Sequence, residues 1–175
     1  MINIPSFQSY NGVIAVCGAS NISEENYHLA EQLGQEIAKK QYILICGGLE
    51  GTMEAVCKGV KSQKGFTIGI LPGYEKSQAN KYVDLIIPSG IGEARNFILV
   101  SSADGIITLS GGAGTLSEIA FAWRLKKPIV SLSTSGGWSQ KLAGTRIDES
   151  RKEKIQGAKT PKKAVEQLIE LMRVI

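Results

Sequence analysis

Histidine is almost absent from this sequence, because His28 is its only example among 175 residues. Cysteine is scarce too, and the spacing of Cys17, Cys46 and Cys57 is not typical of metal ligands. We therefore expect no bound metal ion. Cys17 and Cys46 each end an apolar run, and we interpret the cysteines as buried, reduced thiols.

Long hydrophobic runs and a strong charge of one sign are also missing. No apolar run approaches the ~20 residues that span a bilayer, and the N-terminus lacks the charged and apolar segments of a secretion signal. We therefore expect a cytoplasmic protein without a membrane partner. The net charge is +4, and the mixed signs after Arg146 indicate a solvated helix face, so no nucleic-acid partner is expected.

Apolar runs and helical patterns alternate along the whole chain. Strands are predicted at 13–17, 42–46, 67–71, 83–87, 105–109 and 129–132, and polar loops at 73–81 and 133–137. Helices are predicted behind the N-cap Ser23, at 52–61, 92–102 and 115–126, and at 161–172 behind Thr160. Because such apolar strands need helices on both faces, we predict a three-layer α/β sandwich with a mostly parallel sheet of about six or seven strands. Residues 1–175 are expected to form one domain.

The most informative stretch is a glycine-rich turn, Ser110–Glu118, between a predicted strand and a predicted helix. Gly111, Gly112 and Gly114 let backbone N–H groups approach a ligand without interference from a Cβ atom. A helix that begins here would direct unpaired N–H groups and its positive dipole end at an anion, which predicts a phosphate site. Glu118 then has two interpretations: it caps this helix together with Thr115, or it has a chemical role toward the ligand.

Two further turns of small residues follow other predicted strands. Gly47, Gly48 and Gly51 precede a helix that starts at Thr52, and the segment Gly18-Ala19-Ser20 follows the first strand. Because the carboxyl ends of parallel strands share one edge, we expect all these turns to converge on the phosphate site. The alternative is that the glycines of the second turn only make a tight strand–helix connection. Neither the dinucleotide-binding fingerprint nor the P-loop motif is present, so a dehydrogenase or a P-loop ATPase is poorly supported.

Arg95 and Asn96 lie in the first turn of the helix predicted at 92–102. A cation at that position opposes the helix dipole, so Arg95 needs a purpose other than helix stability. Its guanidinium could grip a phosphate with two hydrogen bonds. An ion pair with Glu93, or plain exposure, is the alternative. Asn96 is either a hydrogen-bonding partner of the ligand or an ordinary helix residue.

Two segments expected to flank this edge, Phe97–Val100 and Ile119–Trp123, carry apolar side chains on nearly all sides of their helices. A helix that is apolar all round is buried, so we expect a subunit interface between them. Trp138 could cover a planar ligand, and packing is an equally supported alternative.

Together, Arg95 and the two glycine-rich turns resemble the superfamily of the Lonely Guy cytokinin-activating phosphoribohydrolases, or lysine decarboxylase-like proteins, and the molybdenum cofactor carrier proteins. The resemblance covers roughly residues 12–135. Arg95 and Glu118 match the catalytic arginine and glutamate of the phosphoribohydrolases, and the segment Gly111–Thr115 matches their phosphate loop. Two positions depart from that pattern: Ser110 stands in place of the motif proline, and Asn96 in place of the lysine of an Arg-Lys pair.

The segments Ile70–Gly73, Gly92–Asn96 and Gly136–Trp138 are more similar to the carrier branch. The resemblance implies a Rossmann-like homo-oligomer, a dimer or tetramer, with one of two functions. As a carrier, the chain would bind the phosphate-bearing molybdenum cofactor and pass it to molybdoenzymes. As an enzyme, it would hydrolyse the N-glycosidic bond of a nucleoside 5′-monophosphate, with Arg95 orienting the substrate and Glu118 stabilising an oxocarbenium-like centre or activating water. The carrier is favoured, with ligand contacts expected from Gly18, Ala19, Ser20, Gly47, Gly48, Gly51, Thr52, Arg95, Asn96, Gly111, Gly112, Gly114, Thr115 and Glu118.

Overall fold

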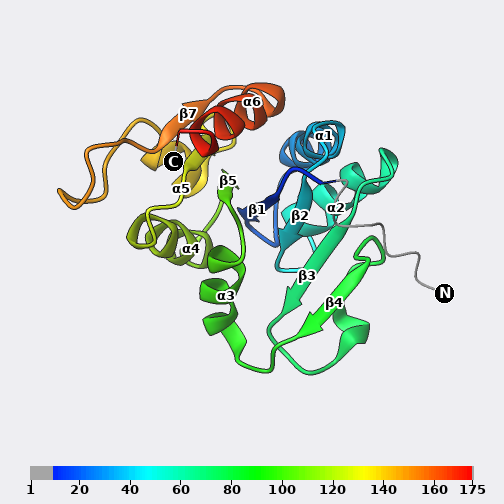
Figure 1. The fold of residues 1–175 in the computed structure, drawn as a ribbon. Helices are drawn as coiled ribbons and strands as arrows, with labels where there is room; N and C mark the ends of the chain where they lie inside the picture. The colour runs from blue at the N-terminus through cyan, green and yellow to red at the C-terminus, as the bar shows by residue number, and fades with distance from the viewer. Residues whose placement is uncertain (1–9, 175) are drawn as a thin grey trace.

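A seven-stranded sheet with the strand order β4-β3-β2-β1-β5-β6-β7 organises the computed structural model, which describes residues 10–174 (Figure 1). All neighbouring strands pair in parallel, which confirms the predicted sheet. The strands are β1 (Val13–Gly18), β2 (Ile43–Cys46), β3 (Thr67–Leu71), β4 (Leu85–Pro88), β5 (Gly105–Leu109), β6 (Ile129–Leu132) and β7 (Gln156–Ala158).

Helices cover both faces of the sheet and complete a Rossmann-like three-layer sandwich. One layer holds α1 (Glu24–Lys39), α2 (Thr52–Ser62) and α6 (Pro161–Met172), and the other holds α3 (Arg95–Ser101), α4 (Ala113–Arg124) and α5 (Gly137–Leu142) (Figure 1). Within residues 10–174, no helix has the length and apolar character needed to cross a membrane.

Successive side chains of the central strands point into two different hydrophobic cores. Ile14 and Val16 of β1 join the core under α1, α2 and α6, whereas Ala15 and Cys17 join the core under α3 and α4. Because both faces of these strands are buried, the strands must be apolar throughout, and this is why the sequence pattern located them.

Side-chain caps start two of the helices at the predicted residues. The Ser23 hydroxyl accepts a hydrogen bond from the Asn26 N–H ahead of α1, and the Thr160 hydroxyl accepts one from the Lys163 N–H ahead of α6. Both caps confirm the prediction made from residue type and position.

Several element boundaries differ from the prediction. The helix predicted at 92–102 begins as a 3-10 turn, Gly92–Ala94, because Gly92 has a φ of 59°, outside the α-helical region. The strand predicted at 83–87 is β4, which begins two residues later, at Leu85, because the Val83 N–H still closes the preceding turn by donating to the Asn80 carbonyl. The predicted 73–81 loop contains a 3-10 turn, Lys76–Gln78, and neither α5 nor β7 is predicted at all.

Candidate functional site

A cavity of about 340 Å³ opens at the carboxyl edge of the sheet, where β1 and β5 end. The chain builds β2, β3 and β4 on one side of β1 and then returns to build β5, β6 and β7 on the other. Such a switch point is where open α/β sheets bind ligands. The lining residues are Gly18, Ala19, Ser20, Asn21, Leu49, Met53, Glu93, Arg95, Asn96, Gly112, Gly114, Thr115 and Glu118.

Most of the predicted site residues therefore meet at one cavity. Those that line it are Gly18, Ala19, Ser20, Arg95, Asn96, Gly112, Gly114, Thr115 and Glu118. The predicted residues outside the lining are Gly47, Gly48, Gly51, Thr52 and Gly111. Asn21, Leu49, Met53 and Glu93 were not predicted as site residues. Of these, only Glu93 had a signal in the sequence, as a carboxylate next to Arg95.

The N-termini of α2 and α4 point to this edge without side-chain caps. Their N-cap residues are Gly51 and Gly112, and neither makes a side-chain hydrogen bond. The first N–H groups of a helix have no acceptor within the helix. In α2 the Thr52 N–H donates to Ala19, but at Gly112 a Cβ atom would meet nothing within 4 Å. The N-terminus of α4 is thus open to an anion.

The capping-box interpretation of Glu118 is wrong. The helix begins at Ala113 and not behind Thr115, because Gly112 is the N-cap and its carbonyl accepts from the Leu116 N–H. Glu118 consequently lies more than one turn inside α4, where it cannot cap the helix, and its side chain lines the cavity.

The glycines outside the lining bring the walls of the cavity close together. Gly51 has a φ of 66°, and a Cβ atom there would lie 2.2 Å from the Ser20 carbonyl oxygen. A Cβ atom on Gly47 would lie 2.6 Å from Met53 Sδ, and one on Gly48 would lie 3.0 Å from a neighbouring backbone carbon of β3. These contacts match the packing alternative for this turn.

The glycine-rich turn that leads into α4 begins with an unusual backbone. Ser110 has a φ of 56° and Gly111 a φ of 101°. The N-terminal turn of α5 secures this conformation, because the N–H groups of Trp138 and Ser139 donate to the carbonyls of Gly111 and Ser110. The Ser110 N–H donates to the Ser135 hydroxyl at 2.6 Å. Trp138 thus packs behind the loop and is not part of the lining.

Arg95 is buried beneath the cavity and is 6% exposed, so the alternative of plain solvent exposure is wrong. Its Nη1 atom donates to the carbonyl of Gly47, directly after β2, and to that of Ile70, near the end of β3. No Glu93–Arg95 ion pair forms among residues 10–174, and the Arg95 Nε–H finds no partner there. The guanidinium therefore braces two strand ends while it contributes positive charge to the lining.

Glu118 is also buried, with 8% exposure. Burial raises its pKa from the ordinary 4.5 to about 7, while a hydrogen bond with Cys17 and the charge of Arg95 oppose this rise. Asn96, next to it in the lining, donates to the Ser117 hydroxyl at 3.0 Å and lies 3.5 Å from the Glu93 carboxylate. The cavity thus combines an open helix N-terminus with two carboxyl groups.

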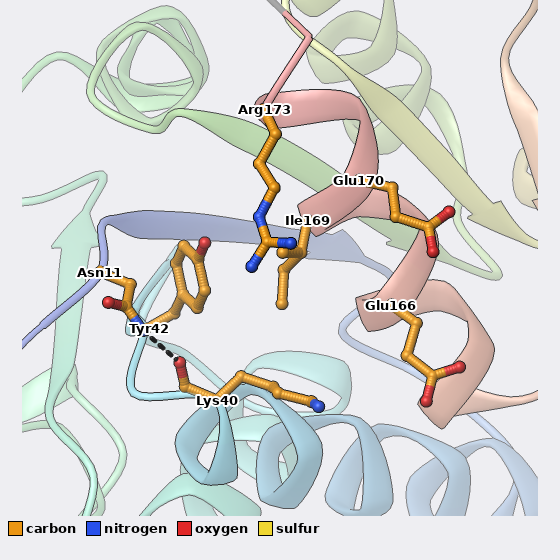
Figure 2. Close-up of a pocket in the computed structure, with 7 residues that line it drawn as sticks. All are labelled: Asn11, Lys40, Tyr42, Glu166, Ile169, Glu170 and Arg173. Carbon is orange, nitrogen blue, oxygen red and sulfur yellow. Dashed lines mark hydrogen bonds between the residues drawn. The ribbon is translucent and has the colours of Figure 1, made fainter.

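A second hollow, of about 410 Å³, lies at the opposite, amino edge of the sheet (Figure 2). Figure 2 shows Lys40 and Arg173 entering it, each from the end of a helix, beside Tyr42. These residues are the C-caps of α1 and α6, where a cation complements the negative end of the helix dipole. The cations of this hollow therefore have a structural explanation in the helix dipoles.

Comparisons with known proteins show which family and which solved structures this chain resembles. A model of the SLOG cluster4 family matches residues 11–165. The molybdenum cofactor binding protein of Rippkaea orientalis is 33% identical with a TM-score of 0.80, over 92% of this chain and 97% of its own. The Moco carrier protein of Chlamydomonas reinhardtii is 30% identical with a TM-score of 0.81, over 94% and 99%. The cytokinin riboside 5′-monophosphate phosphoribohydrolase of Mycobacterium tuberculosis is 32% identical over 63% of this chain, and the match spans only 61% of that enzyme.

Proposed function

The chain belongs to the SLOG cluster4 family, and from this premise we propose that it binds and carries a phosphate-bearing pterin cofactor, as a molybdenum cofactor carrier does. The cofactor is then cargo. One observation carries the proposal: the open N-terminus of α4 at Gly112 faces the same cavity as the Glu93 and Glu118 carboxyl groups. The cavity therefore offers groups that suit both the phosphate and the heterocycle of such a ligand.

The phosphate fits the glycine end of the cavity. There the first turn of α4 offers N–H groups, Gly112 leaves open space, and Arg95 supplies positive charge. The lining also suits the heterocycle, because Glu93 and Glu118 can accept hydrogen bonds from the amino and ring N–H groups of a pterin.

Two features favour carriage over hydrolysis. Because Asn96 stands in place of the lysine of the phosphoribohydrolases, Arg95 is the only cation among the described residues that line the cavity. The φ of 56° at Ser110 is closed to proline, whose ring holds φ near −65°, so this loop differs from the one the enzyme motif requires. In addition, the carriers match nearly the whole chain.

The alternative is a nucleoside 5′-monophosphate phosphoribohydrolase. The observation in its favour is Glu118, whose pKa of about 7 suits a general acid or base near neutral pH. In that case Glu118 would activate water or stabilise the positive charge that develops on the ribose, and Arg95 would hold the substrate.

The two functions predict opposite results in a paired experiment. Purified protein is incubated with AMP and related monophosphates to measure released base, and saturable binding of molybdenum cofactor is measured separately. A carrier binds the cofactor and releases no base. Its affinity for the cofactor falls in Gly112→Ala but not in Gly73→Ala, a control that lies outside the lining. Base release that disappears in Glu118→Gln would instead establish the enzyme.

We also propose that the chain forms a homo-oligomer through α3 and α4. Phe97 and Ile98 are 46% and 40% exposed, and the Phe97 ring meets the Phe121 ring of α4 edge-on at 5.4 Å. Leu85 and Ile87 extend this apolar surface across β4, because their pairing partners face the same core as α3. Light scattering should show a dimer or tetramer that Phe97→Asp dissociates and the distant Ile147→Asp does not. A monomeric wild-type protein would refute the interface.

We further propose that the protein is cytoplasmic and that it transfers its cofactor to molybdoenzymes.

A further inference from the structure

Two cysteines that the proposed function does not use lie side by side behind the cavity wall. Cys46 ends β2 and Cys57 lies in α2, and their Sγ atoms are 3.5 Å apart. Both side chains are buried in the core under α1, α2 and α6. A disulfide bond has a length of about 2.05 Å, so an approach of roughly 1.5 Å by the two sulfurs would form one.

We propose that Cys46 and Cys57 form a reversible disulfide with a peroxide as the oxidant, and that this bond reshapes the backbone at Gly47 and Gly48. The Cys46 sulfur attacks one peroxide oxygen and becomes a sulfenic acid while the O–O bond breaks, and with hydrogen peroxide the other oxygen leaves as water. The Cys57 sulfur then attacks the Cys46 sulfur, and the hydroxyl leaves with the Cys57 proton as a second water. Two thiols and one peroxide thus yield one disulfide and two waters.

The surroundings assign the first step to Cys46. The hydrogen bond that its sulfur shares with Cys57, the one that the Gly48 N–H donates to it, and the charge of Arg95 lower the pKa of Cys46. The same pairing and burial raise the pKa of Cys57 well above its usual value. A thiolate is the form that reacts with peroxides, and the neighbouring thiol is already in position to resolve the sulfenic acid.

Cys17 provides a matched control within the same chain. It is equally buried, but it lies in the other core, on the α3 and α4 face of the sheet. Burial and the nearby Glu118 raise the pKa of Cys17 well above its usual value. Because all three sulfurs are shielded, peroxide must enter through local opening, so only pairing and pKa distinguish Cys46 and Cys57 from Cys17.

The bond would act on the cavity through the turn that follows β2. The Gly48 N–H lies 3.4 Å from Cys46 Sγ, and the Gly47 carbonyl accepts from Arg95. Drawing Cys46 toward α2 weakens the first contact and shifts the second, while Leu49 and Arg95 both line the cavity. An effect on ligand binding rests on the proposed function, whereas the disulfide and the backbone shift do not.

Mass spectrometry tests the disulfide without any ligand. The full chain is treated with hydrogen peroxide, denatured in an alkylating agent and mapped. We expect alkylation of Cys17 alone, a Cys46–Cys57 cross-link, and full recovery with dithiothreitol. Cys17→Ser should keep the cross-link and Cys57→Ser should lose it. Three alkylated cysteines after treatment, or a cross-link that includes Cys17, would overturn the proposal.

Backbone amide NMR on the wild-type protein tests the structural consequence and needs no variant that must fold. Oxidation should shift the Gly47, Gly48 and Leu49 amide signals, and reduction should restore them. The amide of Gly157 in β7, the edge strand four strands away from β2, serves as the internal reference. A cross-linked protein with unchanged signals at Gly47 and Gly48 would contradict the proposed coupling to the cavity.

Discussion

Replacing Glu118 with Gln should change how the stability of the protein depends on pH. Burial raises the pKa of this carboxyl group from 4.5 to about 7 in the native fold, and unfolding would return it to its ordinary value. Glu118 is 8% exposed, so solvent screens the effect little. Gln has nearly the same shape and does not titrate, so it isolates the contribution of the charge.

The magnitude follows from the two pKa values. The separation between 4.5 and about 7 corresponds to roughly 3 kcal/mol, at about 1.4 kcal/mol for each pH unit. Between these values the native state keeps a proton that the unfolded chain has released. The free energy of unfolding therefore falls as the pH rises through this window, and the loss is complete above the native pKa. In Glu118→Gln this fall is absent.

Urea unfolding at several pH values from about 5 to 8 measures the effect. The free energy of unfolding of Glu118→Gln minus that of the wild type should increase by roughly 2 to 3 kcal/mol across this range. Glu75→Gln, which changes an exposed glutamate outside the cavity, should show no such trend. A constant difference between Glu118→Gln and the wild type would refute the reasoning about burial.

Three further comparisons of stability, with five substitutions in all, test the geometry of the site. Ser110→Pro should lower the free energy of unfolding by more than ~1 kcal/mol, because proline cannot adopt the φ of 56°, whereas Ser110→Gly should raise it; thermal unfolding compares them. Gly111→Ala should lower the melting temperature, because its Cβ atom would lie 2.4 Å from Thr115, whereas Gly112→Ala should leave it nearly unchanged. Arg95→Lys should lower the free energy of unfolding by about 1–3 kcal/mol in urea, because the shorter lysine side chain does not put a nitrogen at the position of Nη1, which donates to both Gly47 and Ile70. If Ser110→Pro were as stable as Ser110→Gly, or Gly111→Ala as stable as Gly112→Ala, the argument from backbone geometry would be wrong. If Arg95→Lys were as stable as the wild type, the bonds of Arg95 would not stabilise the fold.

The parts of the fold that the sequence predicts are those with local signals. β3, β5 and β6 are found at their predicted bounds because each is a buried apolar run that ends at a small or turn-forming residue. Ser23 and Thr160 are recognisable as N-caps because their hydroxyl groups bond within the next turn. By contrast, β7 is three residues long, and it is a strand only because β6 offers it a partner from a distant part of the chain.

The same distinction applies to the candidate site. Glycine-rich turns after parallel strands are local features, and the topology of the sheet brings them together. The direction of Arg95 is not local, because it depends on the carbonyls of Gly47 and Ile70, which lie at the ends of two strands far away in the sequence. Its sequence position could suggest a phosphate ligand or a Glu93 ion pair, but not a bond to two strand ends.

These bonds of Arg95 decide which variants can separate carriage from catalysis. Because the guanidinium braces the ends of two strands and also lowers the pKa of Glu118, any Arg95 variant would disturb the fold, the charge of the cavity and the protonation of Glu118 together. Loss of binding or of turnover in such a variant would therefore identify no function. Glu118 makes no hydrogen bond that secures the start of α4, so Glu118→Gln can remove its charge while the phosphate end of the cavity stays intact. A carrier should then keep most of its affinity for the phosphate of its ligand, whereas a hydrolase should lose turnover and still bind the monophosphate.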